Sequence, residues 1–180
     1  MSNNREVRKP QEKIHLYLAL QRTGTAKDKR CFRQVIKDEE LDLKVIEAKC
    51  KVFGGDWRIH KTVNARDPEK ARKYLLKHLI DHPEHASYID SEWRTALMQR
   101  ECRAENYFML DIDTQEMDKL HLLYNLIEKA DGKVLKTIET PKGFHYITEP
   151  FDTREVCKLD YVTLLRDGYY YIKTVRNKTI

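Results

Sequence analysis

The chain has 180 residues, which predicts a single domain over residues 1–180 with enough length to bury a core. Hydrophobic residues make up 41% and charged residues 35%, a balance typical of a globular protein with a heavily charged surface. The net charge of +5 permits a nucleic-acid or nucleotide partner without requiring one. The four cysteines form no C-x-x-C pair, so neither a zinc ribbon nor a small disulfide framework is indicated.

The N-terminal residues, the apolar runs and the cysteines indicate the cellular compartment. Residues 1–11 are polar and basic, lack the apolar segment of a signal peptide, and are expected to form a flexible arm. No run approaches the ~20 apolar residues that a membrane span requires. Reduced cysteines and the missing signal predict a cytoplasmic protein with no membrane partner.

The first half of the chain is expected to contain two strands and two or three helices. Residues 14–20 form a mostly apolar run that predicts a strand, and residues 57–63 alternate as a second strand. The basic loop at 21–30 fits equally a solvated loop or a contact with a phosphate backbone. Residues 31–52 predict one or two helices, with a strand at 42–46 as the alternative. Asp67 and Pro68 are expected to cap and begin a helix that reaches Leu79.

Three histidines, His78, His82 and His85, have a spacing that resembles a metal site. Pro83 is expected to end the helix between them, and no cysteine lies nearby in the sequence. Surface or cap histidines are therefore the favoured interpretation, with a zinc site as the alternative. A further helix is predicted over residues 87–102.

The stretch that carries most chemistry is Asn106 to Gln115. Tyr107 to Leu110 is a short apolar run, typical of a buried strand, and it continues into Asp111-Ile112-Asp113. Residues two apart in a strand share a face, so the two aspartates are expected side by side with Ile112 in the core. Neighbouring carboxylates repel each other in low dielectric, and Mg²⁺ or Mn²⁺ relieves this. The competing interpretation is an acidic strand end that merely leaves the core.

Downstream, a helix is predicted over residues 116–130, followed by strands at 133–140 and 144–148 around a turn at Pro141-Lys142-Gly143. Residues 161–165 and 169–175 are expected to pair as a hairpin around Asp167-Gly168. A strand–helix–strand step of this length can place His145 beside the acid pair. Asp160 is a third candidate acid, with Asp167 as its rival.

These motifs resemble the catalytic core of the archaeo-eukaryotic primase (primase–polymerase) superfamily, in the form of a minimal phage or plasmid member. The first motif corresponds to Phe108–Asp113, the second to Thr140–His145 and the third to Leu159-Asp160 with its continuation to Arg166 and Lys173-Thr174. Upstream, Trp57–Arg66 resembles the strand that precedes the acid motif. The chain departs from the family in lacking the cysteine cluster of a zinc module.

The resemblance implies an α+β fold. A mostly antiparallel, RRM-like palm sheet would be backed by helices, and a small N-terminal α/β unit would complete a cleft. It implies a template-dependent nucleotidyltransferase, a DNA primase or primase–polymerase, that uses Mg²⁺ or Mn²⁺. Its partners would be single-stranded DNA, nucleoside triphosphates and a separate replicative helicase, in the cytoplasm of a host cell if the origin is viral.

The resemblance also assigns residues. The metal ligands would be Asp111, Asp113 and Asp160, and these three with His145 would be the catalytic set. Nucleotide contacts would come from Lys142, His145, Arg166, Lys173, Arg58, Asn64 and Arg66. A lone basic residue is just as often a solvated charge.

Two other functions stay open. A metal-dependent nuclease or nicking replication initiator would want a His-x-His pair, which His145 lacks, and a nucleophilic tyrosine. A non-catalytic RRM-like nucleic-acid-binding module would display aromatic side chains on its sheet, a role open to Tyr169, Tyr170 and Tyr171. A degenerate site that binds nucleotides without polymerising them is a further alternative.

Overall fold

The structure, a computed structural model, describes residues 13–23 and 30–177. The predicted flexible arm at 1–11 lies outside this range, as does most of the basic loop, including Lys27 and Lys29. Contacts between residues divide the chain into two compact units. A helical unit contains the described residues 13–14 and 65–104, and a larger unit contains 15–64 and 105–177. None of the helices described is long and apolar enough to cross a membrane.

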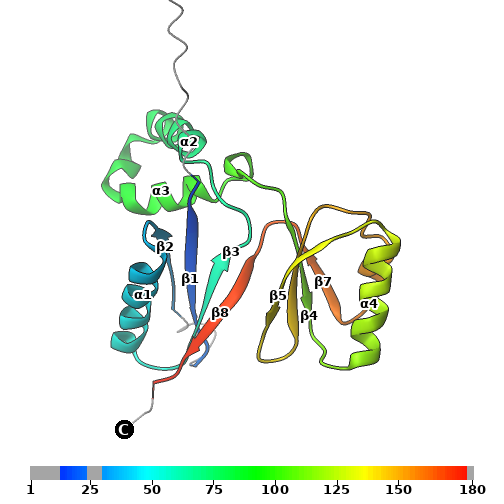
Figure 1. Ribbon diagram of the computed structural model, residues 1–180. Coiled ribbons are helices and arrows are strands. Elements are labelled where there is room, and N and C mark those ends of the chain that lie inside the picture. The colour runs from blue at the N-terminus through cyan, green and yellow to red at the C-terminus, as the bar shows by residue number, and fades with distance from the viewer. Residues whose placement is uncertain (1–12, 24–29, 178–180) are drawn as a thin grey trace, which may run out of the picture. The chain divides into compact units, whose positions relative to one another are not determined.

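The fold is α+β, as predicted, because separate helices cover two antiparallel sheets in the larger unit. The first sheet has the strand order β2-β1-β3-β8 (Figure 1). Its strands are β1 (His15–Gln21), β2 (Cys31–Ile36), β3 (Trp57–Thr62) and β8 (Tyr169–Val175). Helix α1 (Glu39–Phe53) covers one face, where Ile46 and Cys50 pack on Trp57 and Ile59. Alternation therefore leaves Arg58 and His60 on the opposite face.

The segment before α1 corrects the sequence analysis. Residues 31–36 form strand β2 instead of a helix, and residues 42–46 lie inside α1 instead of forming a strand. Phe32 anchors β2 because its ring packs 5.3 Å from the ring of Trp57. The helix begins where the Asp38 carboxylate accepts the backbone N–H of Leu41. This N-cap starts the helix just before residues 42–46, which are therefore helical.

The second sheet has the order β5-β6-β4-β7, again with antiparallel neighbours (Figure 1). Its strands are β4 (Phe108–Ile112), β5 (Val134–Glu139), β6 (Phe144–Thr148) and β7 (Val162–Leu165). Helix α4 (Met117–Lys129) packs on one face through Leu120, Leu123 and Ile127, which contact Leu110 and Ile112. The strands at β4, β5 and β6 and the helix at α4 are confirmed to within two residues.

The predicted hairpin of β7 and β8 is wrong. β7 pairs with β4 in the second sheet, whereas β8 pairs with β3 in the first. The turn at Gly168 is real, and its carbonyl accepts the N–H of Val63 at 2.9 Å. A small core of Val63, Met109, Ile147 and Tyr170 lies where the two sheets meet. Asp167-Gly168 correctly predicted a turn, but the sequence did not show which strands β7 and β8 pair with.

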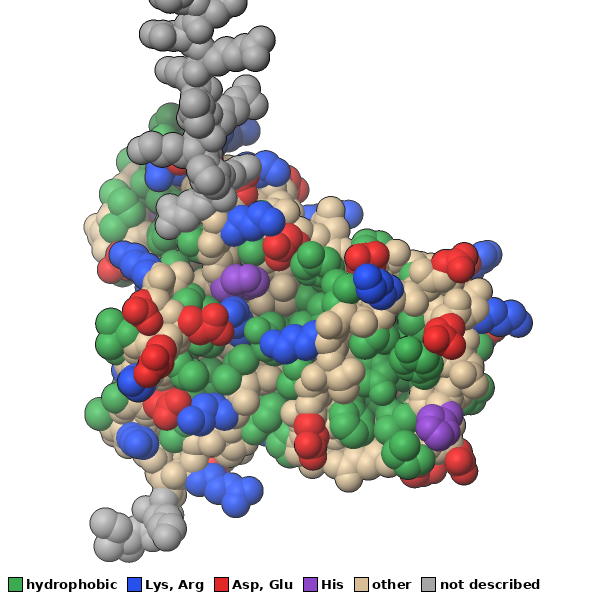
Figure 2. Space-filling model, viewed as in Figure 1, with side chains coloured by type: hydrophobic (Ala, Val, Ile, Leu, Met, Phe, Trp, Pro, Cys, Tyr) green, Lys and Arg blue, Asp and Glu red, His purple; other side chains and the backbone are tan. Residues whose placement is uncertain are grey.

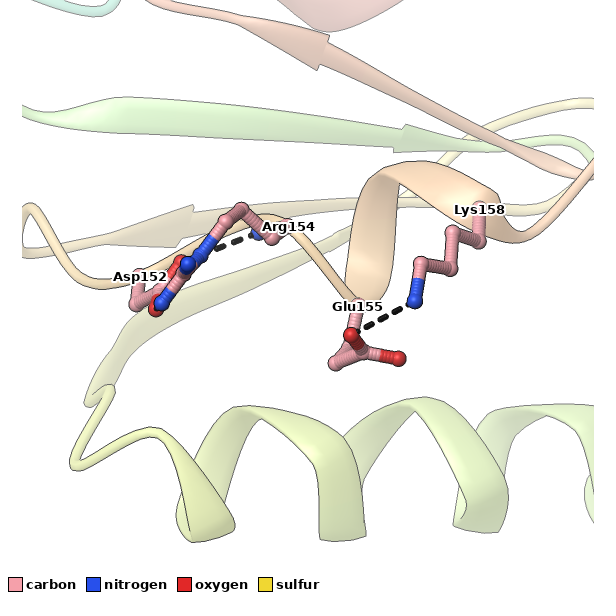
Figure 3. Close-up of polar contacts among 4 residues, drawn as sticks. All are labelled: Asp152, Arg154, Glu155 and Lys158. Atoms are coloured by element: carbon pink, nitrogen blue, oxygen red, sulfur yellow. Dashed lines mark hydrogen bonds and ion pairs between the residues drawn. The ribbon is translucent and has the colours of Figure 1, made fainter.

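The loop between β6 and β7 contains a short 3-10 turn, η3 (Val156–Lys158), and its charges are paired locally (Figure 3). Asp152 accepts from the Arg154 guanidinium, and Glu155 accepts from Lys158 at 2.7 Å. The hydrogen bonds from Arg154 lower the pKa of Asp152 to about 2. These two carboxylates therefore form ion pairs with basic side chains of the same loop.

The helical unit consists of α2 (Pro68–Asp81), η1 (Pro83–Tyr88), α3 (Ile89–Leu97) and η2 (Arg100–Cys102). The predicted cap is confirmed, because the Asp67 carboxylate accepts the N–H groups of Glu69 and Lys70 at 2.9 and 3.1 Å. The single helix predicted over 87–102 is instead broken into η1, α3 and η2. Its buried core is small: Ile14, Ala65, Ala71, Leu75, Ala96, Leu97 and Cys102.

The surface charge is mixed. On the face drawn in Figure 2, basic and acidic side chains are interspersed, with hydrophobic side chains between them. The basic side chains on that face are therefore not gathered into one patch.

Candidate functional site

The acid pair stands at the end of β4, as the sequence predicted. Ile112 is fully buried against α4, whereas the Asp111 side chain is 38% exposed on the opposite face and Asp113 is exposed. The N–H of Asp113 donates to the carbonyl of Tyr161 at 2.9 Å, so the ladder extends one residue past the strand. Two partly hydrated carboxylates on one face offer oxygen ligands of the kind that Mg²⁺ and Mn²⁺ prefer.

His145 lies beside Asp111 on the neighbouring strand β6. The two residues are opposite each other in the ladder, and Nε2 of His145 is 3.2 Å from Oδ1 of Asp111. The other ring nitrogen, Nδ1, accepts the N–H of Tyr171 in β8 at 3.1 Å. An amide can only donate, so Nδ1 must offer its lone pair and the proton lies on Nε2, directed at Asp111. A strand of the first sheet thus fixes the tautomer of a histidine in the second.

A pocket of about 130 Å³ surrounds this contact and draws on both sheets of the larger unit. The first sheet contributes Arg58, His60 and Tyr171, and the second contributes Asp111, Asp113, Thr140, Pro141, Lys142 and His145. A second hollow of about 740 Å³ shares Asp113, Pro141 and Lys142 with it. The small pocket has room for an ion with a few waters or a phosphate group. The larger hollow is shallow and open to solvent.

The turn between β5 and β6 closes against the acid pair because one residue lacks a side chain. A Cβ on Gly143 would lie 1.9 Å from the carbonyl oxygen of Ile112. The Thr140 hydroxyl accepts the N–H of Gly143 at 3.1 Å, which holds the turn in shape. Glycine therefore allows the backbone that carries Lys142 to approach the end of β4.

Two residues of the pocket, His60 and Tyr171, were not predicted to lie beside the acid pair, and Tyr171 was named only as a possible aromatic contact to nucleic acid. They are opposite each other in the β3–β8 ladder, and their rings lie 6.1 Å apart, edge to face. Burial, and then the neighbouring His145 and Arg58 side chains, lower the pKa of His60 to about 4, so its ring is neutral at pH 7. His60 could have been predicted, because it is two residues from Arg58 in a predicted strand and the two side chains therefore share a face. Tyr171 was not placed there because residues 169–175 were paired with residues 161–165 instead of with β3.

The third acid is not in the pocket. Asp160 is exposed and lies near Lys119 of α4. The hydrogen bond and charge of Glu116, and then the charge of Asp160, raise the pKa of Lys119. The residue of β7 opposite Asp111 is Thr163. Asp167 follows the far end of β7, about 13 Å along the strand from Thr163. Neither Asp160 nor Asp167 is therefore among the residues that line the pocket, and β7 places Thr163, not an acid, opposite Asp111.

Arg166 and Lys173 also lie elsewhere. The guanidinium of Arg166 is over the ring of Phe108, at 5.9 Å, at the end of β4 remote from Asp113. Lys173 donates to Glu47 of α1 at 2.9 Å. A bulge explains its direction: Ile59 pairs with Lys173 but His60 pairs with Tyr171, so one extra residue of β8 turns Lys173 to the helix side.

Asn64 and Arg66 are buried and do not line the pocket, although nucleotide contacts were expected for them. Asn64 is fully buried, accepts the N–H of Tyr107 at 2.6 Å and donates to its carbonyl at 3.1 Å. This amide pair holds the chain as it enters β4. Arg66 is fully buried in the helical unit, where its backbone forms bridges with Ile14 and Arg103.

The tyrosine run does not form an aromatic platform. Tyr170 is buried in the small core between the sheets, and burial raises its pKa to about 12. Tyr171 alone lines the pocket, where its hydroxyl lies 2.9 Å from that of Thr174.

Of the predicted site residues, the pocket thus brings together Arg58, Asp111, Asp113, Lys142 and His145. It places two carboxylates and two basic side chains around one buried imidazole, an arrangement suited to binding a metal-chelated phosphate. No protein-family model, curated protein or solved structure matches this chain.

Proposed function

We propose that this chain is a metal-dependent nucleotidyltransferase of the primase–polymerase type, acting on nucleoside triphosphates and a single-stranded DNA template in DNA replication. The observation that carries the proposal is the contact of His145 with Asp111 in a pocket that also contains Asp113, Arg58 and Lys142. The second sheet adds support from its element order, strand–helix–strand–strand–short helix–strand, which resembles the split βαβ order of RRM-like palms.

The donor set suits one Mg²⁺ or Mn²⁺ better than the two-ion, three-aspartate arrangement implied by the resemblance. Mg²⁺ is commonly held by one or two carboxylates together with substrate phosphates, and Asp111 and Asp113 supply two. Bound there, the ion would lower the pKa of a primer 3′-hydroxyl and offset the charge of the departing pyrophosphate.

The residues of the chain have distinct roles in this proposal. Lys142, exposed on the turn, and Arg58, on the opposite sheet, face the acid pair from two sides and would bind the triphosphate. His145 would orient Asp111 through its Nε2–H, since its Nδ1 is already occupied by the amide of Tyr171. Positioning and charge neutralisation would then supply most of the acceleration.

A primer-independent synthesis assay tests the proposal. Labelled nucleotides, single-stranded DNA and Mn²⁺ or Mg²⁺ are incubated with wild type, with an Asp111→Ala/Asp113→Ala variant and with Asp160→Ala. Wild type and Asp160→Ala should make labelled oligonucleotides, and the double variant should make none. Absence of product from wild type with either metal, also with a primer supplied, would overturn the polymerase activity of this chain.

A phosphodiesterase is the second candidate, because the pocket is also lined by a second histidine, His60, and by Tyr171. The same carboxylate pair could serve metal-dependent hydrolysis or nicking. Incubation of the same variants with end-labelled DNA separates the two. Cleavage that needs Asp111, together with a covalent protein–DNA species lost in Tyr171→Phe, would favour the nicking enzyme.

A further inference from the structure

A second group of metal-ligating side chains lies in the helical unit, apart from the pocket described above. His78 is in α2, His85 in η1 and Glu92 in the first turn of α3. One ligand atom from each lies within 4.8 Å of the others. From these three residues we propose a zinc site that joins the three helical segments.

The separations fit a small tetrahedral ion. Nε2 of His78 is 3.0 Å from Nδ1 of His85, and the two nitrogens are each 3.4 Å from an oxygen of Glu92. Ligands held at about 2.0–2.1 Å by a tetrahedral ion are about 3.3–3.4 Å apart. Two imidazoles and a carboxylate are a known ligand set for zinc, with the fourth position open to water.

Hydrogen bonding alone does not satisfy the three groups. If His78 donates to His85, Nδ1 of His85 uses its lone pair in that bond and has no proton for the Glu92 oxygen 3.4 Å away. If His85 donates to His78, Nε2 of His78 likewise has no proton for the other oxygen at 3.4 Å. In either neutral tautomer one nitrogen therefore lies beside a carboxylate oxygen with no hydrogen between them, and a carboxylate can only accept. A cation at the centre receives all three lone pairs.

The fold of η1 supplies an independent reason. This segment contains no buried residue, and His85 is its one half-buried residue. The unit also has a small core, so little apolar contact fixes η1 between α2 and α3. A metal bound by one side chain from each segment would fix it, as structural zinc does in other small units.

This arrangement revises the interpretation of the histidines made from the sequence. Pro83 does end the helix, and His82 is its C-cap residue. The turn that follows, however, directs His85 back toward His78 instead of separating the two rings. His82 is exposed, with its Nδ1 3.6 Å from Glu84.

The test measures Zn²⁺ binding by equilibrium dialysis and metal analysis on the full chain, without a histidine tag. An Asp111→Asn/Asp113→Asn background removes binding at the acid pair. One equivalent of Zn²⁺ should bind in this background and in a further variant, His121→Ala, which changes an exposed histidine of α4. His78→Ala and the isosteric Glu92→Gln should weaken binding by about tenfold or more, at least as much as losing a supporting contact does.

Cobalt provides a second readout. Co²⁺ in the same background should give visible absorption bands typical of tetrahedral coordination, and His78→Ala and Glu92→Gln should abolish them. Circular dichroism of the metal-free variants establishes that they fold. No Zn²⁺ binding by the background protein, or binding unchanged in both ligand variants, would overturn the site.

Discussion

Gly143 offers the sharpest test of how the candidate site is built. A methyl group at this position would meet the carbonyl oxygen of Ile112 at 1.9 Å, and real Cβ contacts are essentially never closer than 3.0 Å. Gly143→Ala therefore requires the β5–β6 turn to move about 1.1 Å from the end of β4. The atom in the way is backbone, so no side-chain rotation relieves the contact.

The displacement has two expected consequences. Overpacking of this size costs about 1–3 kcal/mol of unfolding free energy. Because the same turn carries Lys142 and lies beside Asp113, a shift of about 1 Å should also reduce nucleotide transfer by about a hundredfold.

Urea unfolding and the synthesis assay measure the two effects. Gly168→Ala is the matched control: its Cβ would lie 3.2 Å from Cβ of Leu165 and from Cε of Met109, a much milder contact than 1.9 Å. It should lose less stability than Gly143→Ala and keep its activity. Equal stability of Gly143→Ala and wild type would refute the close approach of the turn to β4.

Three further predictions concern single side chains. His145→Ala leaves the N–H of Tyr171 without its acceptor, so it should lose about 1–3 kcal/mol in urea unfolding and all synthesis activity; unchanged stability would contradict the hydrogen bond. Burial lowers the pKa of His60 from 6.5 to about 4, so its contribution to stability is complete above pH 6.5 and is lost as the pH falls toward 4. Wild type should therefore lose up to about 3 kcal/mol more than His60→Gln between pH 7 and 4, and parallel pH profiles would disprove this. Asp67→Ala should cost about 1 kcal/mol in thermal unfolding while Asp67→Asn costs little, and equal losses would argue against the cap.

Local patterns predicted the acid pair and its neighbour correctly. Alternation placed Asp111 and Asp113 on one face, and the chain length between Asp113 and His145 suits a return to the next strand. The helix that makes this return, α4, had a regular apolar stripe and a Gly132 stop. Each of these features depends on residues near one another in the sequence, where periodicity carries information.

Local sequence patterns could not predict which distant strands pair or in which register. The pairing of β7 with β4 places Thr163, not an acid, opposite Asp111, and a bulge in β8 turns Lys173 to α1. His60 and Tyr171 become neighbours only because β8 joins the first sheet. In each case the outcome depends on which strands pair and in which register, and a turn or an apolar run does not encode that choice.

The return of β8 to the first sheet has a consequence for how the chain folds during synthesis. Until β8 emerges from the ribosome, β3 is an edge strand whose open hydrogen-bonding groups can pair with another chain. The partner of Trp57 in that ladder is Val175, and the whole second sheet is made in between. The acid pair can thus be in place before Tyr171 arrives to fix His145. Nascent or truncated chains that lack β8 should bind metal weakly, transfer no nucleotides and aggregate, so the last strand couples maturation of the site to completion of the sheet.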